Sequence, residues 1–116
     1  MAQNGALKEV FVALVVTVKG RSVEGSIRRT WGTLAFDASY PTNGEAYINA
    51  NFELFSVEQI NVYPSLGYIF EPDLANKKIK AFYGDYSEAS DGALVEVTNT
   101  GDLSSITAAR WEAIGV

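Results

Sequence analysis

The acidic segment near residue 85 comes closest to a chemical site in residue type and spacing. Asp85, Glu88 and Asp91 place three carboxylates between two glycines. Carboxylate oxygens are ligands that Ca²⁺ favours, but the EF-hand pattern is absent. We therefore interpret residues 85–92 as an exposed acidic loop, with calcium binding left open as an alternative.

The chain contains no histidine and no cysteine. By itself it therefore cannot form a Ser-His-Asp triad, a Cys-His dyad, a disulfide or one of the usual zinc sites. A glycine-rich phosphate loop followed by lysine is also missing. Paired carboxylates could still act on a glycosidic bond, yet the acidic residues fall mainly in predicted turns. The sequence predicts a protein that works by contact, with no enzymatic activity and no cofactor.

The charge balance of the chain bears on its partners. The net charge is −5, with only 9 lysines and arginines, so neutralisation of a phosphate backbone is not favoured and no nucleic-acid partner is expected. The most apolar stretch, residues 10–16, is about half as long as a membrane-spanning helix, so no membrane partner is expected. The one local basic cluster, Lys77, Lys78 and Lys80, is interpreted as a solvated strand edge.

Alternation of apolar and polar residues predicts an all-β fold. Strands are expected over residues 9–19, 27–37, 57–64, 66–71, 78–83, 93–97 and 105–114. A chain of 116 residues is long enough for one hydrophobic core. We predict one domain over residues 1–116, an antiparallel β-sandwich or jelly roll of about seven strands with at most one short helix. Residues 1–8 could form an extended N-terminal arm.

Three segments in the first half of the chain carry more specific expectations. The strand over residues 9–19 is predicted to be buried on both faces or to lie at a subunit contact. Residues 20–26 are expected to form the turn that follows it. Gly32 is expected to mark a β-bulge or a close approach of two backbones. Residues 37–45, which contain an Asn-Gly pair, are predicted to be a surface loop.

A short helix and a hairpin are expected in the middle of the chain. In residues 46–55, the spacing of Ile48, Phe52 and Phe55 predicts one or two helical turns with these side chains on one face. The strands over residues 66–71 and 78–83 are expected to pair as an antiparallel hairpin.

Part of the sequence resembles a group of short tailed-phage virion proteins. Residues 32–45, GTLAFDASYPTNGE, are similar to the signature GTI-FDSSYPTGGE of that group. Three further stretches, GYIFE at 67–71, NKKIKA at 76–81, and DLS at 102–104 followed by AIG at 113–115, are similar to the group's segments GYVFEYD, NKKIKAY and TDLS…AIG. The resemblance covers roughly residues 26–115.

This resemblance implies a capsid-associated structural protein. The expected role is that of a cement or decoration subunit, a β-rich homotrimer that lies over junctions between capsid subunits. Its partners would be the major capsid protein and further copies of this chain. Its location would be the virion, after assembly in the host cytoplasm.

The residues expected at the partner interface come from the first strand and its neighbours. They are Leu7, Val10, Val12 and Leu14 on the first strand, with Arg28, Arg29 and Tyr40 nearby. Abundant valine, tyrosine and phenylalanine suit sheets that pack between subunits.

A carbohydrate-binding β-sandwich, attached to a virion or secreted, is the alternative function. Aromatic rings suit sugar contacts as well as protein contacts. Trp31, Trp111 or Tyr86 would provide the stacking surface. This alternative requires an exposed tryptophan, so the exposure of these side chains separates the two hypotheses.

Overall fold

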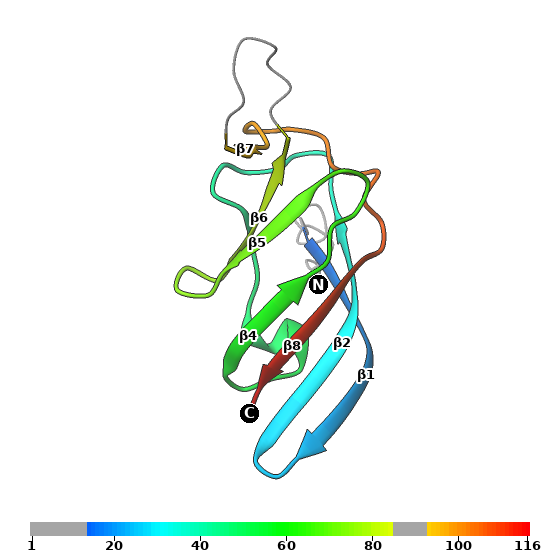
Figure 1. Ribbon diagram of the computed structural model, residues 1–116, viewed down its shortest axis with the longest axis vertical. Helices are drawn as coiled ribbons and strands as arrows, with labels where there is room; N and C mark the ends of the chain where they lie inside the picture. The colour runs from blue at the N-terminus through cyan, green and yellow to red at the C-terminus, as the bar shows by residue number, and fades with distance from the viewer. Residues whose placement is uncertain (1–13, 85–92) are drawn as a thin grey trace, which may run out of the picture.

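The computed structural model describes residues 14–84 and 93–116, which form two antiparallel β-sheets (Figure 1). The strands are β1 (Leu14–Glu24), β2 (Ile27–Phe36), β3 (Glu45–Ala46), β4 (Val57–Val62), β5 (Ile69–Asp73), β6 (Lys78–Tyr83), β7 (Val95–Glu96) and β8 (Ala109–Gly115). A single 3₁₀ turn, η2, covers Asn49–Phe52. The predicted all-β sandwich is confirmed, with eight strands in the described residues where about seven were expected. The predicted arm 1–8 and acidic loop 85–92 lie outside the described residues.

The larger sheet joins segments that are far apart in the sequence. Its strand order is β1-β2-β8-β4, and the smaller sheet has the order β3-β6-β5 with β7 also paired to β6. Trp111 of β8 lies opposite Gly32 of β2 on one side and Val62 of β4 on the other. The last strand of the chain is therefore inserted between two earlier ones (Figure 1).

The core lies between the two sheets and is rich in aromatic rings. Phe36 of β2 stacks on Phe70 of β5, with ring centroids 5.2 Å apart. Phe52 of η2 meets the ring of Trp111 edge-on at 4.8 Å. Offset and edge-on pairs of this kind add to the stabilisation that comes from burial. These contacts connect both sheets and η2 in one cluster.

The first described strand differs from its prediction in extent and in burial. β1 continues to Glu24, and only Gly25 and Ser26 form the turn, with φ 66° at Gly25. The prediction of a turn is therefore wrong for residues 20–24, which pair with β2. Half-buried and exposed residues alternate along β1, so its described part is not buried on both faces.

A β-bulge interrupts the pairing of β1 with β2. The register shifts between Val18 and Gly20, which leaves Lys19 as the extra residue. Across from it, a Cβ on Gly32 would lie only 1.8 Å from the carbonyl oxygen of Thr17. The close backbone approach predicted at Gly32 is confirmed, whereas the extra residue of the bulge belongs to β1.

The segment 37–45 is a surface loop except at Tyr40 and at its C-terminal end. Ala38, Ser39, Pro41, Thr42 and Asn43 are exposed, but Tyr40, Gly44 and Glu45 are buried. Tyr40 forms an isolated bridge with Gly101, and its backbone exchanges hydrogen bonds with residues 100 and 101. The prediction of a surface loop is therefore wrong at Tyr40 and Glu45, because the chain at these two positions is paired with other segments.

The predicted short helix is present as the single turn η2. Phe52 is buried, but Ile48 and Phe55 are exposed. The predicted apolar face is wrong because one 3₁₀ turn does not align residues that are spaced for an α-helix.

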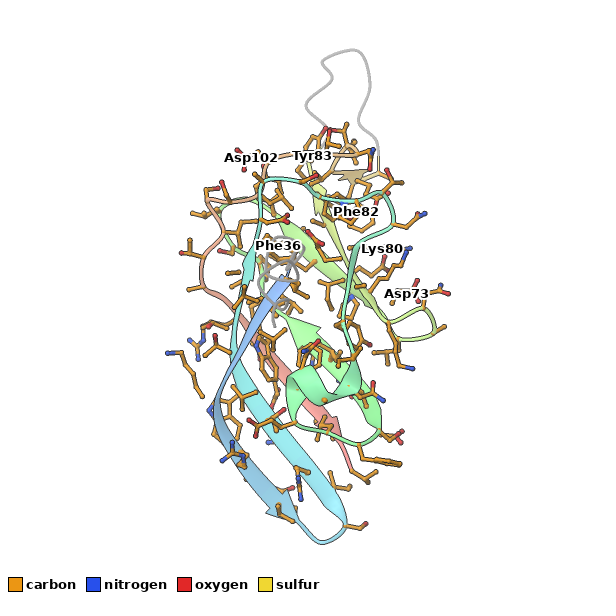
Figure 2. All side chains as sticks on the ribbon, turned by 180° about the vertical axis from the view of Figure 1, so that it is seen from behind. Phe36, Asp73, Lys80, Phe82, Tyr83 and Asp102 are labelled. Carbon is orange, nitrogen blue, oxygen red and sulfur yellow. The ribbon has the colours of Figure 1, made fainter. Side chains whose placement is uncertain are left out.

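The hairpin of β5 and β6 is confirmed, with pairing from Ile69 opposite Phe82 to Asp73 opposite Lys78. Lys78 and Lys80 share one face, and Lys80 lies opposite Glu71. Their interpretation as a strand edge is wrong, because β6 is paired on both sides. Figure 2 shows Asp73 and Lys80 on this hairpin. The lysine pair is thus set across from acidic residues and is no isolated basic patch.

The last strand begins later than predicted. The prediction placed it from residue 105, but β8 starts at Ala109. Leu103 and Ile106 in the preceding segment are buried outside any strand. They contribute to the core through turns, such as the hydrogen bond from the Ile106 amide to the carbonyl of Leu103.

Candidate functional site

The candidate site lies on the outer face of the larger sheet, which points away from the core. Alternate residues of β2 and β8 are buried, as expected where side chains point to opposite sides of a sheet. The buried ones are Thr30, Gly32, Leu34, Phe36, Ala109, Trp111, Ala113 and Gly115. Trp31, Thr33, Arg110 and Glu112 lie between them and therefore belong to the outer face.

Strand pairing places these outer-face residues in two adjacent rows. Trp31 lies opposite Glu112, and Thr33 lies opposite Arg110. Tyr63, which follows β4 directly, donates its backbone N–H to the carbonyl of Arg110 at 2.8 Å. Trp31 and Tyr63 are thus two strands apart across the sheet and two residues apart along the strands. This separation corresponds to ~12 Å between their Cα atoms.

A hollow of about 570 Å³ opens on the outer face. Its lining includes Lys19, Trp31, Thr33, Tyr63, Arg110 and Glu112. Trp31 is 40% exposed and Tyr63 is 49% exposed. The hollow therefore combines two accessible aromatic rings with side chains of both charges. We call it the Trp31 hollow.

The indole of Trp31 is positioned by a glycine on the neighbouring strand. Gly20 lies opposite Trp31, directly after the bulge at Lys19. A Cβ at position 20 would be 2.4 Å from Cζ2 of the indole. Only glycine leaves room for the ring to lie against β1. One side of the indole is thus held by the strand, while part of the ring remains open to solvent.

Positive charge gathers around the Trp31 hollow although the chain as a whole is acidic. Arg29 places Nε 3.3 Å from Oε2 of Glu112. Among the described residues, Lys19 and Arg110 make no ion pair. The lining of the hollow thus contains Lys19, Arg110 and one carboxylate, that of Glu112, with Arg29 beside it, in a chain whose net charge is −5. The surface presents two basic side chains to which an anionic group could bind.

A separate polar cluster lies in the interior around Tyr40. Its hydroxyl donates to Oε2 of Glu96 at 2.7 Å and accepts the Ala81 amide at 3.0 Å. Burial, together with the hydrogen bond to Glu96, raises the pKa of the Tyr40 hydroxyl well above its ordinary value. All these polar partners belong to the chain itself, so we interpret the cluster as part of the scaffold.

Glu45 is the most unusual ionisable residue of the described chain. Its side chain is 1% exposed, and neither carboxylate oxygen has a hydrogen-bond partner. Burial and the nearby negative charge of Asp37 raise the pKa of Glu45 to about 8. A buried carboxyl group without a partner avoids much of its desolvation cost by staying protonated. Glu45 is therefore neutral over much of the physiological pH range.

The structure describes four of the seven residues predicted at a partner interface. Arg28 is exposed and Arg29 is partly buried beside Glu112. Leu14 packs against the core. Tyr40 is enclosed in the core, so its side chain is not available to a partner. Leu7, Val10 and Val12 lie outside the described residues.

Of the two described tryptophans predicted as sugar-stacking surfaces, Trp31 has the required exposure and Trp111 does not. Trp111 is 1% exposed, and its Nε1 donates to the carbonyl of Thr33 at 3.0 Å, so the prediction is wrong for this residue. Tyr86 lies outside the described residues. Sequence reasoning missed Tyr63 and Arg110 as neighbours of Trp31, because only the strand order brings them to the same face.

Several exposed apolar side chains lie toward one end of the larger sheet. They are Val23 and Ile27, on opposite faces of the β1–β2 hairpin, together with Ile48, Phe55 and Val116, and we call this group the terminal patch. The amide of Phe55 donates to the carbonyl of Val116 at 2.7 Å. Figure 1 shows the turn between β1 and β2 and the C-terminal end of β8 toward this end of the sheet. The patch is thus assembled from three separate segments of the chain.

In residues 14–84 and 93–116, no group of three or more acidic side chains is placed to hold a metal ion. Within the same ranges, no helix has the length and apolar character needed to cross a membrane. No protein-family model matches the chain, and neither a curated protein nor a solved structure gives a significant match.

Proposed function

We propose that this protein is a structural subunit of a phage virion, a capsid cement or decoration protein that stabilises the shell through protein–protein contacts. The proposal rests on the resemblance of residues 32–45 to phage virion proteins and on the terminal patch. It assigns the protein a binding role with no catalytic step. Its location would be the virion, after assembly in the host cytoplasm.

The resembling segment has a structural task in this fold. It runs from the end of β2 through the buried Tyr40 to β3. Tyr40 connects this segment to β6 through the Ala81 amide and to β7 through Glu96. The signature therefore specifies how the scaffold is joined together, which suits a protein whose function is to present surfaces.

The observation that carries the proposal is the exposure of the terminal patch. Phe55 is 88% exposed, although a phenylalanine ring gains free energy when it is removed from water. Clusters of exposed apolar side chains commonly mark protein interaction sites. At roughly 2.5 kcal/mol for each 100 Å² of apolar area buried, before the costs of association, a patch of this kind can hold a subunit in place.

The proposed partners are the major capsid protein and further copies of this chain, with a trimer as the favoured assembly. A closed oligomer would multiply each weak contact by the number of subunits. Size-exclusion chromatography with light scattering tests this point. We expect a trimer or another closed oligomer at tens of micromolar, whereas a monomer would count against self-assembly.

Co-sedimentation with capsids that lack this protein tests the proposed function directly. The wild-type chain should pellet with the capsids, and Phe55→Ser should remain in the supernatant. Leu94→Ser is the matched control, because Leu94 is also an exposed apolar residue but lies beside β7, outside the terminal patch. If wild type stays in the supernatant, the cement role is wrong. If both variants bind like wild type, the terminal patch is not the contact.

A further inference from the structure

The Trp31 hollow has features of a ligand site that are independent of the terminal patch. It combines a positioned indole, a second aromatic ring and two basic side chains without ion-pair partners in the described residues. We propose that the hollow binds an acidic saccharide, with a pyranose ring on the indole of Trp31 and the sugar carboxylate at Arg110 and Lys19.

The indole supplies the first half of this recognition. The π face of an aromatic ring is electron-rich, and the C–H groups on one face of a pyranose carry partial positive charge, so the two surfaces attract each other. The Trp31 ring already lies against the backbone of β1 at Gly20 before any ligand arrives. A ring that is already fixed loses little conformational entropy on binding. This arrangement suits a flat, partly apolar ligand such as a sugar ring.

The basic side chains supply the second half and select an acid. Arg110 is exposed and lies on the strand adjacent to Trp31, one residue pair further along. Its planar guanidinium can donate two parallel hydrogen bonds to a carboxylate. Lys19 adds a second positive charge to the lining. A neutral sugar would leave both cations unused, whereas a uronic acid offers one carboxylate on each ring.

The remaining lining residues can serve sugar hydroxyl groups. Glu112 accepts hydrogen bonds, and the hydroxyl of Thr33 both donates and accepts. Tyr63 lies on the far side of the hollow, at ~12 Å from Trp31 between Cα atoms. This span leaves room for a short oligosaccharide. A chain of uronic acid units would place one ring on Trp31 and a later ring near Tyr63.

Single-stranded nucleic acid also binds to aromatic rings beside cations. It requires a groove of cations that follows the phosphate backbone. Here Glu112 stands directly opposite Trp31, in a chain with a net charge of −5. Because the Glu112 carboxylate lies in the same row of the sheet as Trp31, it can accept hydrogen bonds from sugar hydroxyl groups, whereas it repels phosphate groups. Nucleic acid is therefore the competing outcome of the test.

The test titrates the purified chain with trimers of galacturonate and of mannuronate at low salt, followed by tryptophan fluorescence and calorimetry. Maltotriose is the neutral probe and oligo-dT is the nucleic-acid probe. We expect at least one uronate trimer to bind, to bind more weakly as salt increases, and to bind more tightly than both other probes. Binding of neither uronate, or tighter binding of maltotriose or oligo-dT, would overturn the proposal.

Variants connect the binding to the residues. Trp31→Ala should weaken uronate binding roughly tenfold, while Trp31→Phe keeps an aromatic face and should recover part of the loss. Arg110→Gln should weaken binding of the acid and reduce its salt dependence. Thermal melts confirm that each variant is folded. Unchanged affinity in both Trp31→Ala and Arg110→Gln would place any binding elsewhere and overturn the assignment.

The proposed saccharide binding and the proposed capsid binding involve different residues, so each can be disproved without the other. Phe55→Ser should keep full affinity for the uronate trimers, because Phe55 does not line the hollow. Trp31→Ala should still co-sediment with capsids. If Trp31→Ala loses capsid binding instead and no uronate binds, the hollow is part of the protein interface and the saccharide assignment is wrong.

Discussion

The hydroxyl of Tyr40 donates a hydrogen bond of 2.7 Å to the carboxylate of Glu96, 56 residues further along the chain. The same carboxylate oxygen accepts the amide of Asn43 at 2.7 Å. One glutamate therefore holds both the buried tyrosine and the exposed tip of the segment that precedes β3. Together with the buried hydrogen bond from the Ala81 amide to the Tyr40 hydroxyl, these contacts tie the segment to β6 and β7 of the smaller sheet.

Tyr40→Phe should destabilise the protein although it removes a single oxygen atom. The change leaves the Ala81 amide without its acceptor in the interior and removes the donor to Glu96. A buried polar group that loses its partner costs about 1–3 kcal/mol. The free energy of unfolding, measured by urea denaturation, should decrease by about that amount. Tyr63→Phe, at a half-exposed site, is the control, and equal stability of the two variants would contradict the prediction.

Stability should decrease as the pH is raised from about 4.5 to about 8, because of Glu45. Burial raises the pKa of its carboxyl from 4.5 to about 8, so the folded state holds a proton that the unfolded state has released. The contribution is fully present below pH 4.5 and is lost as the pH approaches 8. Within this window the slope can reach about 1.4 kcal/mol per pH unit.

Urea denaturation of wild type and Glu45→Gln at a series of pH values isolates this contribution. Glutamine has nearly the same shape and does not titrate, so the difference between the two curves follows Glu45 alone. The wild type should lose stability relative to the variant as the pH rises. A difference that is constant from pH 4.5 to 8 would show that Glu45 ionises normally in the folded state.

Gly32→Ala should be strongly destabilising. The added methyl group would lie 1.8 Å from the carbonyl oxygen of Thr17, and both atoms belong to paired backbones that cannot move apart without breaking the sheet. Overpacking of this kind costs about 1–3 kcal/mol and often more. Thermal unfolding should show a lower midpoint. Gly84→Ala is the control, because a Cβ there meets nothing within 4 Å, and an equal effect of both changes would contradict the prediction.

The strands in which apolar and polar residues alternate clearly could be predicted from the sequence, because the positions at which apolar residues recur show which face of the strand is buried. β2, β4 and the β5–β6 hairpin follow that rule. The described part of the strand predicted over residues 9–19 is present in β1, but its continuation through residues 20–24 was missed because Gly20 and Gly25 favour a turn. Gly20 is instead required by the ring of Trp31, a tertiary contact that no local pattern reports.

The candidate site could be predicted only in part for a related reason. Trp31 stands out by its residue type, but its neighbours are set by strand order. Arg110 and Tyr63 reach it only because β8 is inserted between β2 and β4. Trp31 and Trp111 also look alike in the sequence, since both lie in alternating strands. The difference between them is which face of the sheet each occupies.

Tryptophan fluorescence should separate these two residues. Trp31 is 40% exposed and Trp111 is 1% exposed, so acrylamide should quench only part of the emission of the wild type. In Trp31→Phe, the remaining emission comes from a buried indole that donates to a carbonyl, and it should resist quenching. In Trp111→Phe, provided the variant stays folded, nearly all the emission should be quenched. Equal quenching of the two variants would mean that the two tryptophans do not occupy opposite faces of the sheet.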